Sequence, residues 1–279
     1  MRESGEAKKC KVCMNACSLL EGQTGACGVR TMRNGVISPD NYGYITALAL
    51  DPIEKKPIKN FHPGSYILSI GSYGCNLRCP FCQNHDISQA HSAEETYARR
   101  TTPEELCEIV RNEKDSIGLA YTYNEPLICY EFVRDCAKLI HDIGKHNVLV
   151  SNGEASAEVL SEILPYMNAM NIDLKGFRDE IYKAYGGDLG LVMGFIEAAA
   201  RSCHVEITSL IVPGMNDSEE DMEAEAKWIA SIDADIPLHI TRYFPQYKMR
   251  DRAPTSVPLM KKLAEIASKY LNHVYLGNV

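Results

Sequence analysis

The chain has 279 residues, of which 45% are hydrophobic and 24% charged, and its formal net charge is −8. This composition excludes a disordered chain and a coiled coil, and the negative charge argues against broad nucleic-acid binding, which requires a basic surface. The sequence contains neither an apolar run of about 20 residues that would cross a membrane nor an apolar N-terminal stretch typical of a secretory signal. We therefore expect a globular, cytoplasmic protein without membrane contact.

Residues 1–60 differ from the rest of the chain, and we expect them to form a small metal-binding segment. They contain four cysteines, several glycines and the charged stretch DPIEKKP at 51–57, but no helical periodicity. Such a pattern favours loops, turns and short strands folded around a metal. The four cysteines, called the N-terminal quartet below, are Cys10, Cys13, Cys17 and Cys27.

The N-terminal quartet supplies four thiolates within 18 residues. Four sulfur ligands suit a tetrahedral zinc ion or a closed iron–sulfur cluster. We favour structural zinc, because the surrounding segment has few other means of building a core. A second [4Fe–4S] cluster that relays electrons is the alternative.

From about residue 66, short apolar runs alternate with amphipathic stretches. The runs predict strands at 66–71, 118–123, 147–152, 169–174, 205–212, 237–243 and 273–277. Helices are expected at 102–113, 126–143, 156–164, 191–201, 218–231 and 258–270, the first opened by a capping box with proline at its first position. Continuous apolar strands separated by helices indicate an α/β fold with a covered parallel sheet. We expect residues 61–279 to form an open or incomplete α/β barrel.

The chain has 11 cysteines, an odd number, and no export signal. A disulfide framework is therefore improbable and metal ligation becomes the leading explanation. Besides the quartet, three cysteines lie close together at 75, 79 and 82. The remaining four are scattered among apolar residues and are expected to be small core side chains: Cys107, Cys129, Cys136 and Cys203.

The strongest motif is the segment 74–82, GCNLRCPFC, which directly follows the first strand of the expected barrel. Cys75, Cys79 and Cys82 can direct three thiolates inward from one compact loop, which we call the cluster loop. Three thiolates satisfy three irons of a [4Fe–4S] cluster and leave the fourth iron open to a substrate or cofactor. The alternative is a structural zinc knuckle with a fourth ligand such as His85.

The CNLRCPFC segment resembles the CxxxCxxC motif of the radical S-adenosylmethionine (SAM) enzymes. Over most of its length the chain looks like the branch related to pyruvate formate-lyase activating enzymes. The segments CGVR, ALDPIEKKP, GCNLRCPFCQN, YTYNEP and IVPGMND resemble, more narrowly, the radical SAM member of the AmmeMemoRadiSam system. The resemblance implies an incomplete (β/α)6-type radical SAM barrel.

The resemblance also implies a reaction. The open iron would bind the methionine part of SAM, and an electron from the reduced cluster would split SAM into methionine and a 5′-deoxyadenosyl radical. That radical would abstract hydrogen from a substrate, possibly a glycyl residue of a protein. A reducing partner such as flavodoxin or ferredoxin is implied as well.

Further positions match family segments that contact SAM. The YTYNEP segment retains Glu125 but has Tyr123 and Asn124 where the family has glycines; an ordinary strand-to-helix turn, with Asn124 as the cap, is the structural alternative. Ser151 and Asn152 match the Thr-Asn-Gly segment, but Val150 replaces the aspartate that contributes to a cation site in activating enzymes. The other matching or adjacent residues are Asp173, Lys175, His239 and Phe81.

Two classes of function follow from these observations. The first is an oxygen-sensitive radical SAM enzyme. The second is a non-enzymatic iron–sulfur or zinc scaffold that binds partners. Formation of 5′-deoxyadenosine would separate the two.

Overall fold

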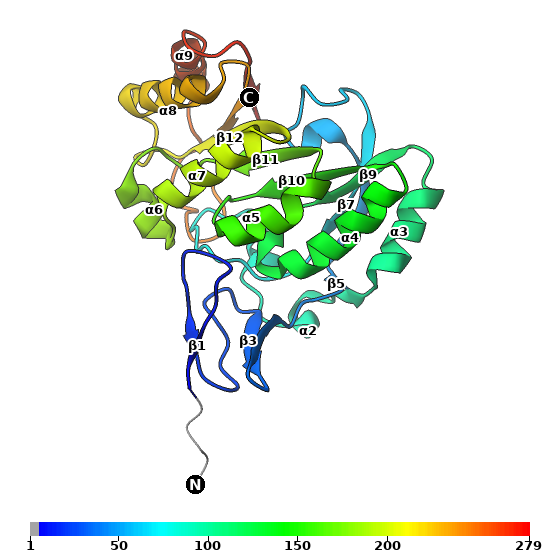
Figure 1. Cartoon of the computed structure of the whole chain (residues 1–279). Helices are drawn as coiled ribbons and strands as arrows, with labels where there is room; N and C mark the ends of the chain where they lie inside the picture. Colours follow the sequence, from blue (N-terminus) through cyan, green and yellow to red (C-terminus); the bar gives the residue numbers. More distant parts are fainter. Residues whose placement is uncertain (1–5) are drawn as a thin grey trace.

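The computed structural model describes residues 6–279, which are built on one eight-stranded sheet (Figure 1). The strand order is β14-β13-β12-β11-β10-β9-β7-β6, and neighbouring strands are parallel except for the antiparallel pair β6 and β7. The strands are β6 (Ala47–Pro52), β7 (Tyr66–Gly71), β9 (Ser116–Tyr121), β10 (His146–Ser151), β11 (Ala169–Asp173), β12 (His204–Ile211), β13 (Leu238–Arg242) and β14 (Val274–Gly277). The predicted α/β class with an open parallel barrel is confirmed.

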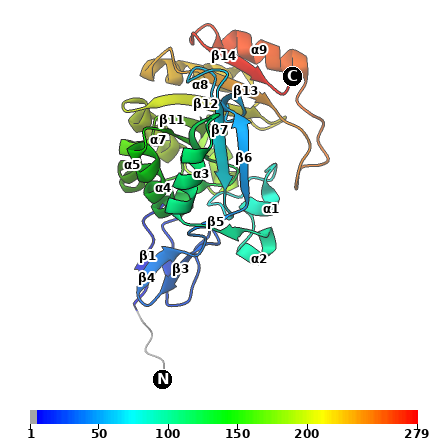
Figure 2. The same cartoon turned by 90° about the vertical axis from the view of Figure 1, so that its right-hand side faces the viewer.

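Helices connect the parallel strands and cover the outer side of the sheet (Figures 1 and 2). The longer ones are α3 (Pro103–Asn112), α4 (Tyr130–Asp142), α5 (Ala157–Ile163), α6 (Asp179–Tyr185), α7 (Leu189–Ala200), α8 (Glu219–Ile232) and α9 (Val257–Ala267). Short helical turns are η1 (Ile53–Lys55), α1 (His85–Ser88), α2 (Ala93–Thr96), η2 (Pro126–Cys129) and η3 (Leu164–Tyr166). Burial of apolar side chains between helices and sheet forms the main core.

The predicted elements lie within three residues of those observed, including the capping box of α3. Thr102 Oγ1 accepts from Glu105 N at 3.2 Å, and the Glu105 carboxylate accepts from Thr102 N at 3.0 Å. The sequence reading missed α6 and β6, and it also missed the short elements α1, α2 and β8. Helix α6 is only seven residues long. Strand β6 is defined by its pairing with β7 rather than by a strong local pattern, and its location before residue 60 brings part of the first segment into the main sheet.

The first part of the chain consists of loops and short strands, as predicted. The strands pair as β1 (Lys8–Lys9) with β2 (Ser18–Leu19), β3 (Arg30–Arg33) with β4 (Val36–Pro39), and β5 (Tyr44–Ile45) with β8 (Arg99–Arg100). The buried Arg30 guanidinium binds both carboxylate oxygens of Glu131 in α4, at 2.7 and 2.9 Å. Such a bidentate pair fixes orientation as well as distance. The division of the chain at residues 60 and 61 stays a prediction.

A buried carboxyl group beneath α8 predicts a pH-dependent stability. Glu225 in α8 is hydrogen-bonded to Ser209 in β12, and Ser209 Oγ also donates to Leu174 O at 3.0 Å. Because a hydroxyl has one proton, both bonds form together when a protonated Glu225 donates to Ser209. Burial raises the pKa of Glu225 to about 8.

The consequence is a loss of stability with rising pH. In the unfolded chain Glu225 has its ordinary pKa of 4.5, whereas in the folded protein its pKa is about 8. The contribution of Glu225 to stability is therefore complete below pH 4.5 and is lost as the pH rises to about 8. We expect Glu225→Gln to raise the free energy of unfolding at pH 8.5 relative to the parent by a few kcal/mol, with little difference at pH 5. Urea unfolding at both pH values, with the exposed Glu220→Gln as control, checks this expectation. Parallel pH profiles for all three proteins would contradict it.

Candidate active site

The cluster loop leaves the carboxyl end of β7, the end at which α/β barrels place their active sites. Gly74 opens the loop with φ +84°, and a Cβ there would lie 2.6 Å from Val29 Cγ1 and 2.9 Å from Cys27 O. Glycine is therefore required both by the left-handed backbone and by the close approach of the N-terminal segment. Cys79 is buried, and Cys75 and Cys82 are half-buried.

Hydrophobic side chains surround the three cysteines. Leu77, Phe81 and Tyr185 belong to one buried cluster with residues of the later barrel loops. The Phe81 and Tyr185 rings meet edge to face with centroids 5.3 Å apart. Phe81 thus packs on α6. The sequence reading missed this helix, although acidic residues in its first turn and Gly186 after its last turn are typical of the two ends of a helix. These side chains shield Cys79 from water, whereas Cys75 and Cys82 stay partly exposed.

Tyr123, which follows β9, has an unusual backbone conformation. Its φ is +73°, in the left-handed region that glycine adopts without strain. Asn84 Nδ2 donates to Tyr123 O at 2.7 Å, and Tyr123 OH donates to Asp51 Oδ2 at 2.9 Å. Tyr123 therefore has a glycine-like backbone at a position where the resemblance implies glycine, and the contacts of its larger side chain stabilise this conformation. Lys56 completes this group with Nζ 2.8 Å from Asp51 Oδ2.

The side chain of Asn124 is hydrogen-bonded to the backbone at the start of the cluster loop. Its Oδ1 accepts from Ser72 N at 2.9 Å, and its Nδ2 donates to Gly74 O at 3.0 Å. The predicted alternative, in which Asn124 caps the next helix, is wrong: Glu125 is the cap of η2, and Pro126 is at the first position. Asn124 bonds to the loop instead, because the backbone groups Ser72 N and Gly74 O lie beyond the end of β7 and need hydrogen-bond partners.

Glu125 joins two neighbouring strand ends. Its Oε1 accepts from Leu127 N and Ser151 Oγ, both at 2.9 Å, and its Oε2 accepts from Asn152 N at 2.8 Å. Burial raises the pKa of Glu125 to about 7, against the effect of these donors. The predicted residues after β9 and β10 are thus brought together in one buried network.

Asn76 extends this network into the cluster loop. Its Oδ1 accepts from Asn152 Nδ2 and its Nδ2 donates to Glu154 O, both at 2.9 Å. Glu154 Oε1 accepts from Asp188 N at 2.6 Å, whereas its buried Oε2 has no hydrogen-bond partner in the described structure. Burial raises the pKa of Glu154 to about 8. The sequence reading assigned no role to Asn76, which lies within the segment 74–82, or to Glu154, which directly follows the matched segment at 151–153.

Asp173 and Lys175, at the end of β11, form an ion pair with 2.8 Å between Oδ2 and Nζ. Burial opposes the charged form of Lys175, but the Asp173 carboxylate and nearby Cys79 raise the pKa of the lysine above its ordinary value. Burial also raises the pKa of the Cys79 thiol to about 11, an effect that the adjacent Lys175 lessens. The Lys175–Asp173 ion pair therefore lies beside the loop that carries the three cysteines.

His239 lies in a separate polar group. Its Nε2 is 2.5 Å from Oε2 of the buried Glu206, which also binds His204 and the backbone amides of residues 59 and 60. Burial opposes ionisation of Glu206, but these donors lower its pKa to about 2. A role for His239 near the adenosyl group stays a prediction.

The N-terminal quartet lies beside the cluster loop. Cys10 N donates to Cys17 O at 2.8 Å, and Ala16, with φ +39°, turns the chain between Cys13 and Cys17. Ala26 N approaches Cys17 Sγ at 3.3 Å, which brings the segment before Cys27 to the first three cysteines. The other four cysteines lie in the main core as predicted, with Cys203 half-buried.

The donor set of the cluster loop fits a [4Fe–4S] cluster. In residues 6–279, no three Cys, His, Asp or Glu side chains are arranged around a single ion. A cluster presents a different iron to each thiolate, so its ligands do not need to converge on one point. Three cysteines on one partly buried loop provide the sulfur ligands that such a group requires.

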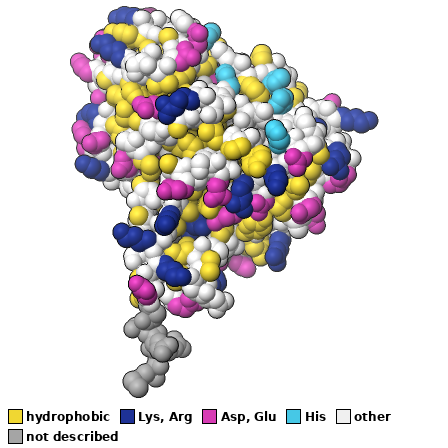
Figure 3. All heavy atoms as spheres, in the orientation of Figure 1, with side chains coloured by type: hydrophobic (Ala, Val, Ile, Leu, Met, Phe, Trp, Pro, Cys, Tyr) yellow, Lys and Arg dark blue, Asp and Glu magenta, His cyan; other side chains and the backbone are white. Residues whose placement is uncertain are grey.

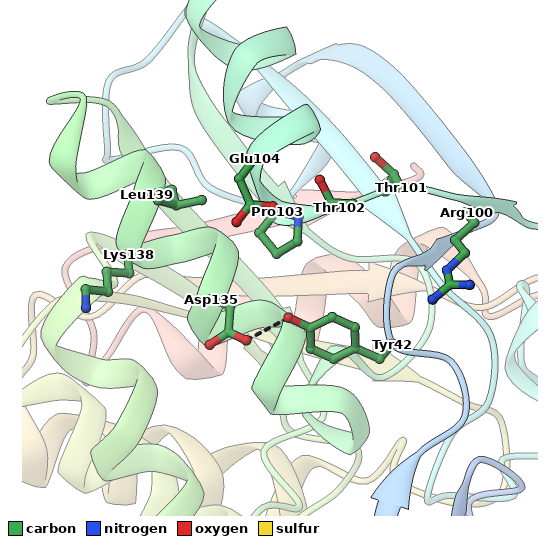
Figure 4. A pocket seen from close by; sticks show the side chains of 9 residues that line it. All are labelled: Tyr42, Arg100, Thr101, Thr102, Pro103, Glu104, Asp135, Lys138 and Leu139. Carbon is green, nitrogen blue, oxygen red and sulfur yellow. Dashed lines mark hydrogen bonds between the residues drawn. The ribbon is translucent and has the colours of Figure 1, made fainter.

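A cavity of about 400 Å³ lies elsewhere, between Tyr42 and helices α3 and α4 (Figure 4). Tyr42 OH donates to Asp135 Oδ2 at 2.7 Å across it. The residues that line it include none of the predicted site residues, so the cavity is separate from the cluster loop. On the face that Figure 3 shows, basic and acidic side chains are interspersed. No helix within residues 6–279 is long and apolar enough to span a membrane.

Comparisons with known proteins agree with this geometry. The family model of the Radical SAM superfamily matches residues 69–229, which include the cluster loop and the ends of β9, β10 and β11. The chain is 37% identical to the uncharacterized protein MJ0808 of Methanocaldococcus jannaschii, over 97% of this chain and 81% of that protein. It is 27% identical to the pyruvate formate-lyase-activating enzyme of Clostridium pasteurianum, over 72% of this chain and 88% of that enzyme.

A solved structure shares the fold. It is a domain of the pyruvate-formate lyase-activating enzyme from Bacteroides vulgatus, with a TM-score of 0.51 and 21% identity over 58% of this chain and 99% of that chain. The family match covers more than half of the chain and contains all three cysteines of the cluster loop. The chain belongs to the radical SAM superfamily and is related to the pyruvate formate-lyase activating enzymes.

Proposed function

We propose that this protein is an enzyme that cleaves SAM reductively and uses the resulting radical to abstract hydrogen from a substrate. The observation that carries the proposal is the placement of Cys75, Cys79 and Cys82 on one loop at the carboxyl end of the barrel, within the family match. A [4Fe–4S] cluster on this loop would supply one electron to SAM, and the C–S bond would break to give methionine and a 5′-deoxyadenosyl radical.

The residues around the loop support this chemistry by positioning and by excluding water. Glu125 holds the segments after β9 and β10 together. The left-handed backbone at Tyr123 presents main-chain groups next to the loop, and carbonyl groups of this kind accept hydrogen bonds from an ammonium group. Leu77, Phe81 and Tyr185 keep the cysteine environment apolar, which protects a reactive radical from side reactions.

The proposed substrate is a glycyl residue of a protein. Hydrogen transfer from the glycine Cα to the 5′-deoxyadenosyl radical would give 5′-deoxyadenosine and a glycyl radical. The relative from Clostridium pasteurianum is named for activating pyruvate formate-lyase, and it spans most of this chain. The electron would come from a low-potential carrier such as flavodoxin or ferredoxin.

Anaerobic reconstitution with iron and sulfide, followed by dithionite and SAM, tests the reaction. We expect 5′-deoxyadenosine and methionine in equal amounts. An intact cluster that yields neither product would refute the enzyme and favour the partner-binding scaffold. Addition of pyruvate formate-lyase tests the substrate separately: a glycyl radical signal in electron paramagnetic resonance (EPR) is expected, and SAM cleavage without it would contradict this part of the proposal.

We also propose that the N-terminal quartet binds a metal, with structural zinc favoured over a second [4Fe–4S] cluster. The supporting observation is that the turn at Ala16 and the contact of Ala26 N with Cys17 Sγ bring the segments that carry the four cysteines close to one another. Within residues 6–279 the sulfurs do not converge on a single ion, so binding of zinc would require the side chains to rotate. Metal analysis of a variant in which Cys75, Cys79 and Cys82 are all replaced by alanine isolates this site. One zinc per chain is the expected result, whereas about four irons would establish the cluster instead.

A further inference from the structure

One side-chain amide touches both cysteine groups of the molecule. Asn15 Nδ2 donates to Asn76 O in the cluster loop at 3.1 Å, and it lies 3.8 Å from Cys13 Sγ of the N-terminal quartet. Asn15 is 61 positions away from Asn76 in the sequence. The contact is therefore a product of the fold, in which the N-terminal segment lies directly against the cluster loop.

The carbonyl that Asn15 binds belongs to a peptide group with a second contact. Leu77 N, the other end of the Asn76–Leu77 peptide, approaches Cys75 Sγ at 3.4 Å. A trans peptide is planar, so its C=O and N–H point in opposite directions and rotate together. A hydrogen bond that holds the carbonyl toward Asn15 thereby directs the N–H toward the sulfur of Cys75.

Other hydrogen bonds restrain the same loop, but they do not involve the C=O or N–H of the Asn76–Leu77 peptide. The Asn76 side chain binds Asn152 and Glu154, and the Arg78 guanidinium bonds to Ala26 O and, at 2.7 Å, to Cys75 O. The two ends of the quartet segment, near Cys13 and near Cys27, thus both contact the cluster loop. Of these contacts, the one from Asn15 acts on the peptide whose N–H approaches a cluster-ligand sulfur.

We propose that Asn15 is a positioning residue for the cluster on Cys75, Cys79 and Cys82, and that it couples the N-terminal quartet to that cluster. This inference rests on the proposed function. A hydrogen bond to a ligating sulfur stabilises the reduced, more negative form of an iron–sulfur cluster and raises its reduction potential. A metal bound at the quartet would hold the turn that contains Asn15. Asn15 in turn holds the Asn76–Leu77 peptide, whose N–H approaches Cys75 Sγ.

The test is the midpoint potential of the reconstituted protein, measured by EPR-monitored titration. Asn15→Ala removes the amide without adding charge, and we expect a more negative midpoint potential, an altered EPR signal of the reduced cluster with SAM, and unchanged iron content. Asn15→Gln, which keeps an amide, should restore part of the shift. Asn112→Ala is the matched control, because Asn112 is an exposed asparagine whose side chain bonds to Glu108 in α3. Wild-type potential and EPR signal in Asn15→Ala would overturn the proposal.

The link to the quartet is tested by a double-mutant cycle. Cys13→Ser should lower the metal content of the quartet and shift the midpoint potential in the same direction as Asn15→Ala. In the Asn15→Ala background, Cys13→Ser should cause no further shift, because the two changes break the same path. Additive shifts would refute coupling through Asn15. Failure of the wild-type protein to cleave SAM, with a normal cluster, would refute the proposed function but leave the effect of Asn15 on the potential measurable.

Discussion

Cys79→Ala is expected to abolish formation of 5′-deoxyadenosine. Cys79 is the central cysteine of the cluster loop, is buried, and lies beside Lys175. Without its thiolate, one further iron of the cluster would lack a protein ligand. Product formation by chromatography and iron content should both fall to background.

Cys107→Ala provides the control for this loss. Cys107 is a buried residue of α3 whose Sγ lies 3.6 Å from Leu139 O, within the main core. Its replacement removes one sulfur atom from a packed interior and is expected to cost about 1 kcal/mol of stability, with SAM cleavage largely retained. Equal loss of activity in both variants would contradict the division of the cysteines into cluster ligands and core residues.

Glu125→Gln is expected to have the second largest effect, even though the two side chains have nearly the same shape. The carboxylate of Glu125 accepts from three donors, two at Oε1 and one at Oε2. In glutamine, one of these oxygens becomes an amide nitrogen, which is a donor and therefore opposes one of the buried donors. An unsatisfied buried group costs about 1–3 kcal/mol.

We expect the segments after β9 and β10 to move apart in Glu125→Gln, because one of their shared hydrogen bonds is lost. SAM binding should weaken about tenfold or more, which corresponds to about 1.4 kcal/mol. Equilibrium binding of SAM to the reconstituted protein and the rate of 5′-deoxyadenosine formation measure the effect. Glu108→Gln, at an exposed position of α3, is the control. If Glu125→Gln binds SAM as tightly as the parent, the network does not position the site.

Much of the fold could be predicted because it depends on local patterns. Apolar runs and capping residues placed the parallel strands and most helices within three residues, since they reflect the burial of one face or of both faces of an element. Helix α6 and strand β6 were missed, because the first is short and the second is defined by its pairing with β7. The cysteine spacing likewise identified both groups of candidate ligands before any contact was known.

The partners of individual site residues could not be predicted in the same way. Asn124 was considered as a helix cap but supports the cluster loop, and Glu125 takes the cap. Tyr123 occupies a position where the resemblance implies glycine, and only its observed φ of +73° shows that its backbone is glycine-like. These outcomes depend on which backbone groups remain unpaired when distant segments meet.

The sequence by itself therefore determined the α/β class, the two cysteine groups and the family to which the chain belongs, because spacing and periodicity are properties of neighbouring residues. Only the tertiary structure decided that the N-terminal quartet lies against the cluster loop and that Asn15 contacts both Cys13 and Asn76. The physical reason is that the contact of Asn15 with Asn76 joins segments 61 positions apart. Which side chains meet across such a separation is decided by packing rather than by a local pattern.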